Sequence, residues 1–171
     1  MSAYADKLAA KVEALKAKTR ARATNIFKAF VLDAYRRIVL KTPVDTGRAK
    51  NNWFVGIEAP DVKTTTAVSP TGAAGNGRAT ITMRDFRLGA KVYITNSLPY
   101  IRVLEYGEYP NPPKRGSRVK GKGWVVKTVD GFSRQAPAGM VGVTMAEMRL
   151  VGKAIAVQSG LQMSGVAVGP K

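Results

Sequence analysis

The feature that most constrains this fold is a long N-terminal stretch without a helix breaker. Residues 4–41 contain neither glycine nor proline and are rich in Ala, Leu, Lys and Arg. Apolar residues recur there at three- and four-residue steps, which is the spacing of one face of an α-helix. We predict one long helix, which at 1.5 Å per residue would span roughly 55 Å.

Such a helix is longer than a compact domain can bury, because a globule of this chain length has a radius of gyration of only about 15 Å. The apolar stripe is interrupted at residues 16–22, KAKTRAR. The helix should therefore either break near this segment or project beyond the domain. A projecting helix with an apolar stripe needs a partner to cover it, so we expect an assembly.

The chain after this helix reads as a small α+β core. Pro43 ends the helix, since the residue before a proline is pushed out of the helical region. Residues 52–58 and 91–95 are strand candidates. Residues 59–77 are rich in Pro, Gly, Ser, Thr and Ala and predict a loop or linker. Residues 79–86 are ambiguous between a strand and a short helix.

The next segment should turn briefly into helix and then into an extended basic region. Residues 99–106 predict one or two helical turns closed by Gly107. Residues 108–123 form a flexible basic loop or hairpin in this interpretation. Residues 124–129 have strand character and are expected to pair with residues 106–109.

A C-terminal helix completes the predicted fold. Pro137 suits a first helical turn, and apolar residues then repeat at helical spacing up to Ile155. The expected organisation is a single domain with a helix over 1–42, an α+β core over 43–157 and a flexible tail over 158–171. The expected fold class, from this mix of helices and strands, is α+β.

Composition excludes several kinds of chemistry. The 171 residues include no His and no Cys, so there is no disulfide framework, thiolate nucleophile, Cys/His zinc site or His-based triad. The N-terminus is charged throughout, and no run of 18 apolar residues occurs. We therefore expect neither a signal peptide nor a membrane anchor, and a protein made in a cytoplasm.

Carboxylates could still hold a hard cation, as in a metal-dependent nuclease. The candidates are Asp45, Asp85, Glu105 and Glu108. Nothing in their spacing requires a metal site, so we expect no cofactor and no enzyme activity.

The charge is strongly unbalanced, with 28 Lys and Arg against 11 Asp and Glu and a formal net charge of +17. The excess gathers in residues 1–41 and 108–134. One of these surfaces should face DNA phosphates or an acidic neighbour through sequence-tolerant electrostatics. The predicted contact residues in the second region are Lys114, Arg115, Arg118, Lys120 and Lys122.

Three segments resemble one known family. They are Pro43-Val44-Asp45-Thr46-Gly47-Arg48 followed by Asn52-Trp53, then residues 93–100 (YITNSLPY) running to Leu104-Glu105-Tyr106-Gly107, and finally residues 133–141 (SRQAPAGMV). In this order, after an N-terminal helix, the chain resembles the tail completion or neck proteins of tailed bacteriophages, a family that includes the minor tail protein Z of lambda-like phages. The segment over 108–132 is longer than the family pattern.

The resemblance implies an α+β fold in which the long helix packs on a small, mainly antiparallel sheet. It also implies a structural virion protein assembled in the bacterial host cytoplasm. It would form a homo-oligomeric ring, expected to be hexameric, that joins the tail tube or its terminator to the head-side connector protein. Double-stranded DNA would pass through the ring without sequence-specific contacts, and no membrane is involved. In a ring of this kind, the apolar helix stripe of one protomer can be buried by the next.

The resemblance also assigns expected roles to individual residues. The loop and turn residues are Asp45, Gly47, Trp53, Asn96 and Pro99, with Asp45 accepting backbone N–H groups. The expected subunit interface contains Glu105, Tyr106 and Gly107. The alternative function is a free-standing, sequence-nonspecific DNA-binding protein that uses the long basic helix and the basic loop.

Overall fold

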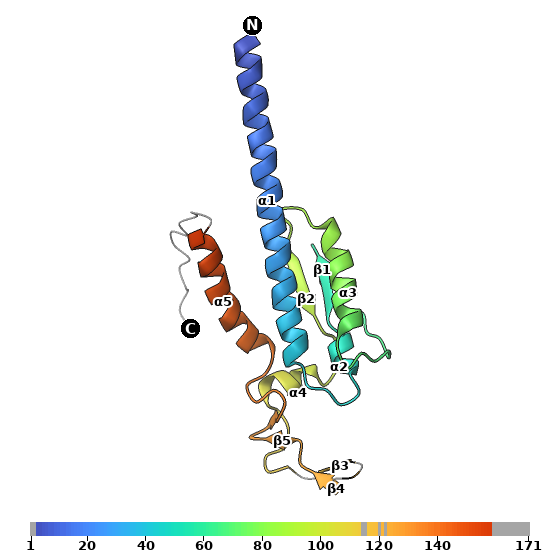
Figure 1. The fold of residues 1–171 in the computed structure, drawn as a ribbon. Helices are drawn as coiled ribbons and strands as arrows, with labels where there is room; N and C mark the ends of the chain where they lie inside the picture. Colours follow the sequence, from blue (N-terminus) through green and yellow to red (C-terminus); the bar gives the residue numbers. More distant parts are fainter. Residues whose placement is uncertain (1–2, 114–115, 120, 122, 159–171) are drawn as a thin grey trace.

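The long helix is continuous and projects beyond the rest of the molecule. The computed structural model describes residues 3–113, 116–119, 121 and 123–158. Helix α1 runs from Ala3 to Lys41, 39 residues, or roughly 58 Å. Residues 3–22 are all exposed, and Figure 1 shows this half of α1 standing clear of the other elements. Of the two outcomes expected from the sequence, projection is the one observed.

The C-terminal half of α1 forms the centre of the hydrophobic core. Its buried residues are Val31, Ala34, Tyr35, Ile38 and Val39, which follow helical spacing and so point to one side. They pack with buried side chains from the other elements, among them Met83, Phe86, Leu98, Leu104 and Met140. The core therefore lies at one end of α1.

Two hydrogen bonds fix the first strand to this helix. The short helix α2 (Arg48–Asn51) leads into β1 (Phe54–Ile57), which pairs antiparallel with β2 (Val92–Thr95). The indole of Trp53, 4% exposed, donates from Nε1 to Thr42 Oγ1 at 2.9 Å. The Tyr35 hydroxyl donates to the Trp53 carbonyl at 2.8 Å, and burial raises the pKa of Tyr35 to about 12. The indole N–H and the carbonyl of Trp53 thus connect the start of β1 to α1 and to Thr42 directly after it.

Part of the predicted linker is helical. Helix α3 runs from Ala73 to Thr82 and continues into the 3-10 turn η1, Met83–Asp85. The loop prediction for residues 59–77 is wrong after Gly72, because residues 73–77 begin α3, which packs on β1 and α1 and buries Gly75 and Ala79. The ambiguous stretch over 79–86 is therefore helix and not strand. Phe86 then stacks on Phe27 of α1 with ring centroids 4.7 Å apart.

The short helix before the basic region is α4, Ile101–Tyr106, and Gly107 closes it in the left-handed conformation at φ 68°. Strand β3 (Ser117–Val119) pairs with β4 (Gly123–Val125), and β5 (Thr128–Val129) pairs with β6 (Phe132–Ser133). The expected pairing of 124–129 with 106–109 is wrong. β3 pairs instead with β4, and β5 with β6, so each pairs with the strand that is next to it in sequence.

Helix α5 runs from Val141 to Gln158 and lies beside α1. Pro137 is outside this helix, because the backbone of residues 136–140 makes turns before α5 begins. The tail predicted over 158–171 falls, after Gln158, outside the described residues.

The expected α+β class is confirmed, with a long N-terminal helix, small antiparallel strand pairs and a C-terminal helix (Figure 1). In place of one sheet, the described strands form three separate two-stranded pairs. No helix within the described part of the chain has the length and apolar character needed to cross a membrane.

We predict that Trp53→Phe lowers the free energy of unfolding by about 1–3 kcal/mol, because it removes the hydrogen bond to Thr42 and leaves a cavity in the core. Urea denaturation followed by circular dichroism measures the change. Trp124→Phe is the matched control, because Trp124 is 68% exposed and should change stability by less than about 0.5 kcal/mol. Equal losses in both variants would contradict the anchoring role of Trp53.

Candidate functional site

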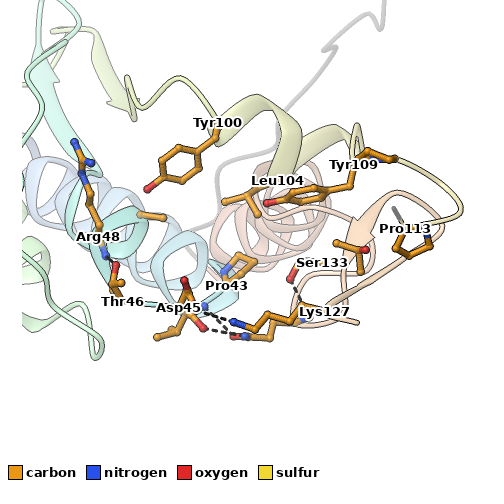
Figure 2. A pocket seen from close by; sticks show the side chains of 16 residues that line it. Pro43, Asp45, Thr46, Arg48, Tyr100, Leu104, Tyr109, Pro113, Lys127 and Ser133 are labelled. Atoms are coloured by element: carbon orange, nitrogen blue, oxygen red, sulfur yellow. Dashed lines mark hydrogen bonds and ion pairs between the residues drawn. The ribbon is translucent and has the colours of Figure 1, made fainter. Parts of the chain in front are cut away.

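The three segments that resemble the phage family meet at one junction, although they lie far apart in sequence. The loop after α1, the start of α4 and the segment before α5 surround a hollow of about 750 Å³ (Figure 2). The hollow is lined by Pro43, Val44, Asp45, Thr46, Gly47, Arg48, Ala49, Tyr100, Leu104, Tyr109, Pro110, Pro113, Lys127, Thr128, Ser133 and Gln135.

The first contact at this junction joins the Pro43–Arg48 loop to the segment before α5. The amide of Gln135 accepts from the Val44 N–H at 2.8 Å and donates to the Val44 carbonyl at 2.9 Å. A side-chain amide has an NH2 donor group and a carbonyl acceptor, so it can donate to and accept from the same backbone residue. Gln135 therefore satisfies both polar groups of one loop residue.

The second contact is a carboxylate at the start of α5. Glu105 Oε2 accepts from the backbone N–H groups of Met140 at 2.8 Å and Val141 at 2.9 Å, and Oε1 accepts from Gly142 at 2.8 Å. The first N–H groups of a helix have no partner within the helix, and a negative charge there is favourable. Glu105 thus caps α5 from α4.

All three of these hydrogen bonds lie within the chain, so Glu105 has a structural role at the start of α5. The subunit-interface role expected for Glu105 stays a prediction. The adjacent Gly107 is also enclosed, because a Cβ added to it would overlap the ring of Phe132. Tyr106 differs from both, since it is 67% exposed and Arg102 lies over its ring.

The expected turn residues before α4 form a compact link. Asn96 Oδ1 accepts from the Leu98 N–H at 3.2 Å, while Nδ2 donates to the Ala49 carbonyl at 3.0 Å. One amide therefore shapes its own turn and holds it to α2. Pro99 follows on the surface, two residues before α4 begins.

The loop after α1 is shaped by Gly47 and only weakly by Asp45. Gly47 adopts φ 89°, and a Cβ there would overlap the backbone of Ser69 and Pro70. Asp45 was expected to accept backbone N–H groups, but its Oδ1 accepts instead from Lys127 Nζ at 2.8 Å. Its side chain is 80% exposed, so the two charges remain hydrated and the pair stabilises little.

Two tyrosines, Tyr100 and Tyr109, are among the residues that line the hollow. Figure 2 shows Tyr100 and Tyr109 on the side opposite the Pro43–Arg48 loop. Burial, with a smaller contribution from Tyr100 and Asp45, raises the pKa of Tyr109, so its hydroxyl is a neutral donor at physiological pH. Tyrosines of this kind offer an apolar face and one hydrogen-bonding tip, and they are enriched in interfaces.

No solved structure, curated protein or protein-family model matches this chain. The family resemblance therefore continues to depend on the three segments and on where the fold places them. They meet through the contacts of Gln135, Glu105 and Asn96.

The structure leaves the predicted basic contact only partly described. Lys114, Arg115, Lys120 and Lys122 lie outside the described residues, and Arg118 is described as a backbone position in β3. The four carboxylates considered as metal ligands do not gather. Within the described part of the chain, no group of three or more Asp and Glu residues could hold a metal ion.

A second candidate surface is the exposed half of α1. Its apolar residues Leu8, Val12 and Leu15 are 52%, 43% and 66% exposed. Beside them, Lys7, Lys11, Lys18 and Arg22 follow steps of four, seven and four residues, which keeps them within about 60° of arc. These cations were predicted only as part of the pooled positive excess over residues 1–41. Their spacing of four and seven residues is the feature of the sequence that could have predicted a basic edge.

We predict that Glu105→Gln lowers stability by about 1–2 kcal/mol, because a neutral amide offers one acceptor oxygen to a helix start that now has three N–H bonds to a carboxylate. Thermal unfolding followed by circular dichroism measures it. Glu108→Gln is the control, because that carboxylate only pairs with exposed Arg102. If the Glu105 variant were as stable as the Glu108 variant, the claim that Glu105 stabilises the start of α5 would be wrong.

Proposed function

We propose that this chain is a structural subunit of a tailed-phage neck, forming a ring, expected to be hexameric, that joins the tail tube to the head-side connector protein around the DNA channel. It would be a virion component assembled in the bacterial cytoplasm. The observation that carries the proposal is the projecting half of α1, whose apolar residues are left uncovered by the described part of the chain.

An uncovered apolar stripe on a long helix is costly for an isolated monomer and useful for a joining protein. Exposed contiguous apolar surface marks contact sites. The core holds only the C-terminal half of α1, so the other half reaches roughly 30 Å from it. A subunit of this shape can contact its own ring through the core and a different component through the helix.

The junction of the three family-like segments supplies the second support. Their contacts are made by polar side chains to backbone groups, at Gln135, Glu105 and Asn96. Such bonds require these residue types at these positions. The hollow between them, together with exposed Tyr106 on α4, is the proposed ring contact.

The charge of the chain fits a channel that DNA passes through. Basic side chains attract phosphates without reading sequence, but many contacts would hold the DNA back. We therefore expect only part of the +17 charge to face the lumen and the remainder to meet acidic neighbours or solvent.

A free-standing DNA-binding protein is the second candidate, favoured by the basic edge of α1. Its test is a titration of the purified protein with duplex DNA at increasing salt. Such a protein would bind as a monomer or dimer, with affinity that falls steeply with salt. Binding of this kind without any ring would favour this candidate.

The proposed function predicts a ring in solution or on phage parts. Sedimentation velocity and negative-stain images of the purified protein should show closed rings, and virions made without the protein should lack attached tails. Tyr106→Arg should disperse the ring through charge repulsion at the contact. The matched control is Ile81→Arg, which changes an apolar residue of similar exposure on α3. A monomer at every concentration, with tails attached in its absence, would contradict the proposal.

A further inference from the structure

Helix α5 covers one face of α1 and stops partway along it. Phe30 of α1 faces Gly152 of α5, and Ile26 and Phe30 share a groove of about 390 Å³ with Gly152, Ile155 and Leu88. The groove continues up α1 to Ala23 and Thr19. It therefore opens toward the exposed half of the helix.

The uncovered apolar residues lie on the same face as the covered ones. Leu8 and Leu15 are seven residues apart, and Val12 precedes Ile26 by two heptads. At 3.6 residues per turn this spacing keeps them on nearly one line. The face that α5 partly covers at half-buried Ile26 and Phe30 thus continues, exposed, over Leu8, Val12 and Leu15.

The way α5 is held shows what such a covering helix needs. Besides its apolar contact, α5 places Glu147 against two cations of α1, with Oε2 at 3.0 Å from Arg37 Nη1 and 2.9 Å from Lys41 Nζ. Hydrogen bonds from Lys41 and Arg37 lower the pKa of Glu147, which keeps it charged. Glu147 thus adds ion pairs to the apolar contact of the covering helix, at cations that follow the line of Phe30 and not the row of Lys7, Lys11, Lys18 and Arg22.

The exposed half of α1 also combines apolar side chains with cations, but its cations form a separate row beside the stripe and face no such acid in the described part of the chain. Lys7, Lys11, Lys18 and Arg22 run beside the apolar stripe, and none has an ion pair within the described part of the chain. Lys16, on the other flank, is already paired with Glu13.

A second copy of this chain cannot supply the missing acids. Of its 11 acidic residues, Glu13, Asp33, Asp45, Asp61, Glu108 and Glu147 are in ion pairs and Glu105 caps α5. The remainder, Asp6, Glu58, Asp85 and Asp130, are spread over α1, the end of β1, η1 and the β5–β6 turn. None of these elements presents an acidic helix face. A self-contact would place one basic edge against another basic surface.

We propose that the exposed half of α1 docks an amphipathic helix of a different protein, with acidic residues beside its apolar face, lying in line with α5. This inference rests on the proposed function as a joining subunit, and it replaces the expected burial of the stripe by the next protomer. Nucleic acid would leave Leu8 and Leu15 uncovered, and a flat anionic membrane could not follow the stripe into the groove beside α5.

The test uses the full-length protein and two labelled, stapled helical peptides of about 20 residues, the length of the exposed half of α1. Both carry the same leucine stripe, flanked by Glu in one and by Lys in the other. Fluorescence anisotropy at about 0.1 M salt should show binding of the Glu peptide and at least about tenfold weaker binding of the Lys peptide.

Two variants locate the contact. Leu8→Asp with Leu15→Asp should weaken the Glu peptide by at least about tenfold, whereas Leu150→Asp, at an exposed leucine on α5, should not. Charge reversal to Glu at Lys7, Lys11, Lys18 and Arg22 should also abolish binding. Charge reversal at Arg87, Lys91, Arg149 and Lys153 should preserve most of it. Circular dichroism checks that each variant stays helical.

Each other occupant has its own readout. Equal binding of both peptides, or unchanged binding by the double leucine variant, would overturn the proposal. Self-association that is lost only in the double leucine variant would also overturn the proposal. Binding of duplex DNA or anionic vesicles that depends on Lys7 and Lys11 would overturn it as well. Ring formation is measured separately by sedimentation. A missing ring with peptide binding retained would reject the proposed function alone, and an intact ring without peptide binding would reject this inference alone.

Discussion

The arrangement of this molecule depends on one carboxylate at the start of a helix. Glu105 accepts three backbone N–H groups from residues 140–142 and so fixes where α5 begins and in which direction it leaves the core. Because α5 then lies along α1, this cap also determines where the covered part of α1 ends. The surface left for a partner is therefore set by a hydrogen-bonded charge about a hundred residues away in sequence.

The sequence was most informative where a local rule acts alone. The absence of Gly and Pro over 4–41 predicted α1, and Gly107 predicted the end of α4. The sequence failed where tertiary packing decided the outcome. Residues 73–77 are rich in Gly and read as a linker, yet Gly75 fits beneath the Tyr35 hydroxyl, and the segment is helical because it packs on the core.

The candidate site shows the same division. Asn96 could be predicted as a turn residue because its side chain bonds to the backbone two residues on. Glu105 could not be predicted as a cap, because its partners are about 35 positions away and no local pattern links them. Asp45 has a sequence typical of a turn, but Lys127 lies within reach and competes for the carboxylate. The basic edge of α1 was visible in the spacing of its lysines, and only the fold shows that the face beside it is uncovered.

The alanine-rich composition of the exposed half of α1 has a consequence for how quickly and tightly it can be recognised. An isolated helix of about 20 residues is marginal in water because its first turn is hard to nucleate. Here the buried half acts as a permanent nucleus, and residues such as Ala9 and Ala10 extend it at small entropic cost. A binding partner thus encounters a preorganised rod, so association spends little free energy on ordering. Fraying would begin at Ala3 and end near the stack of Phe27 on Phe86.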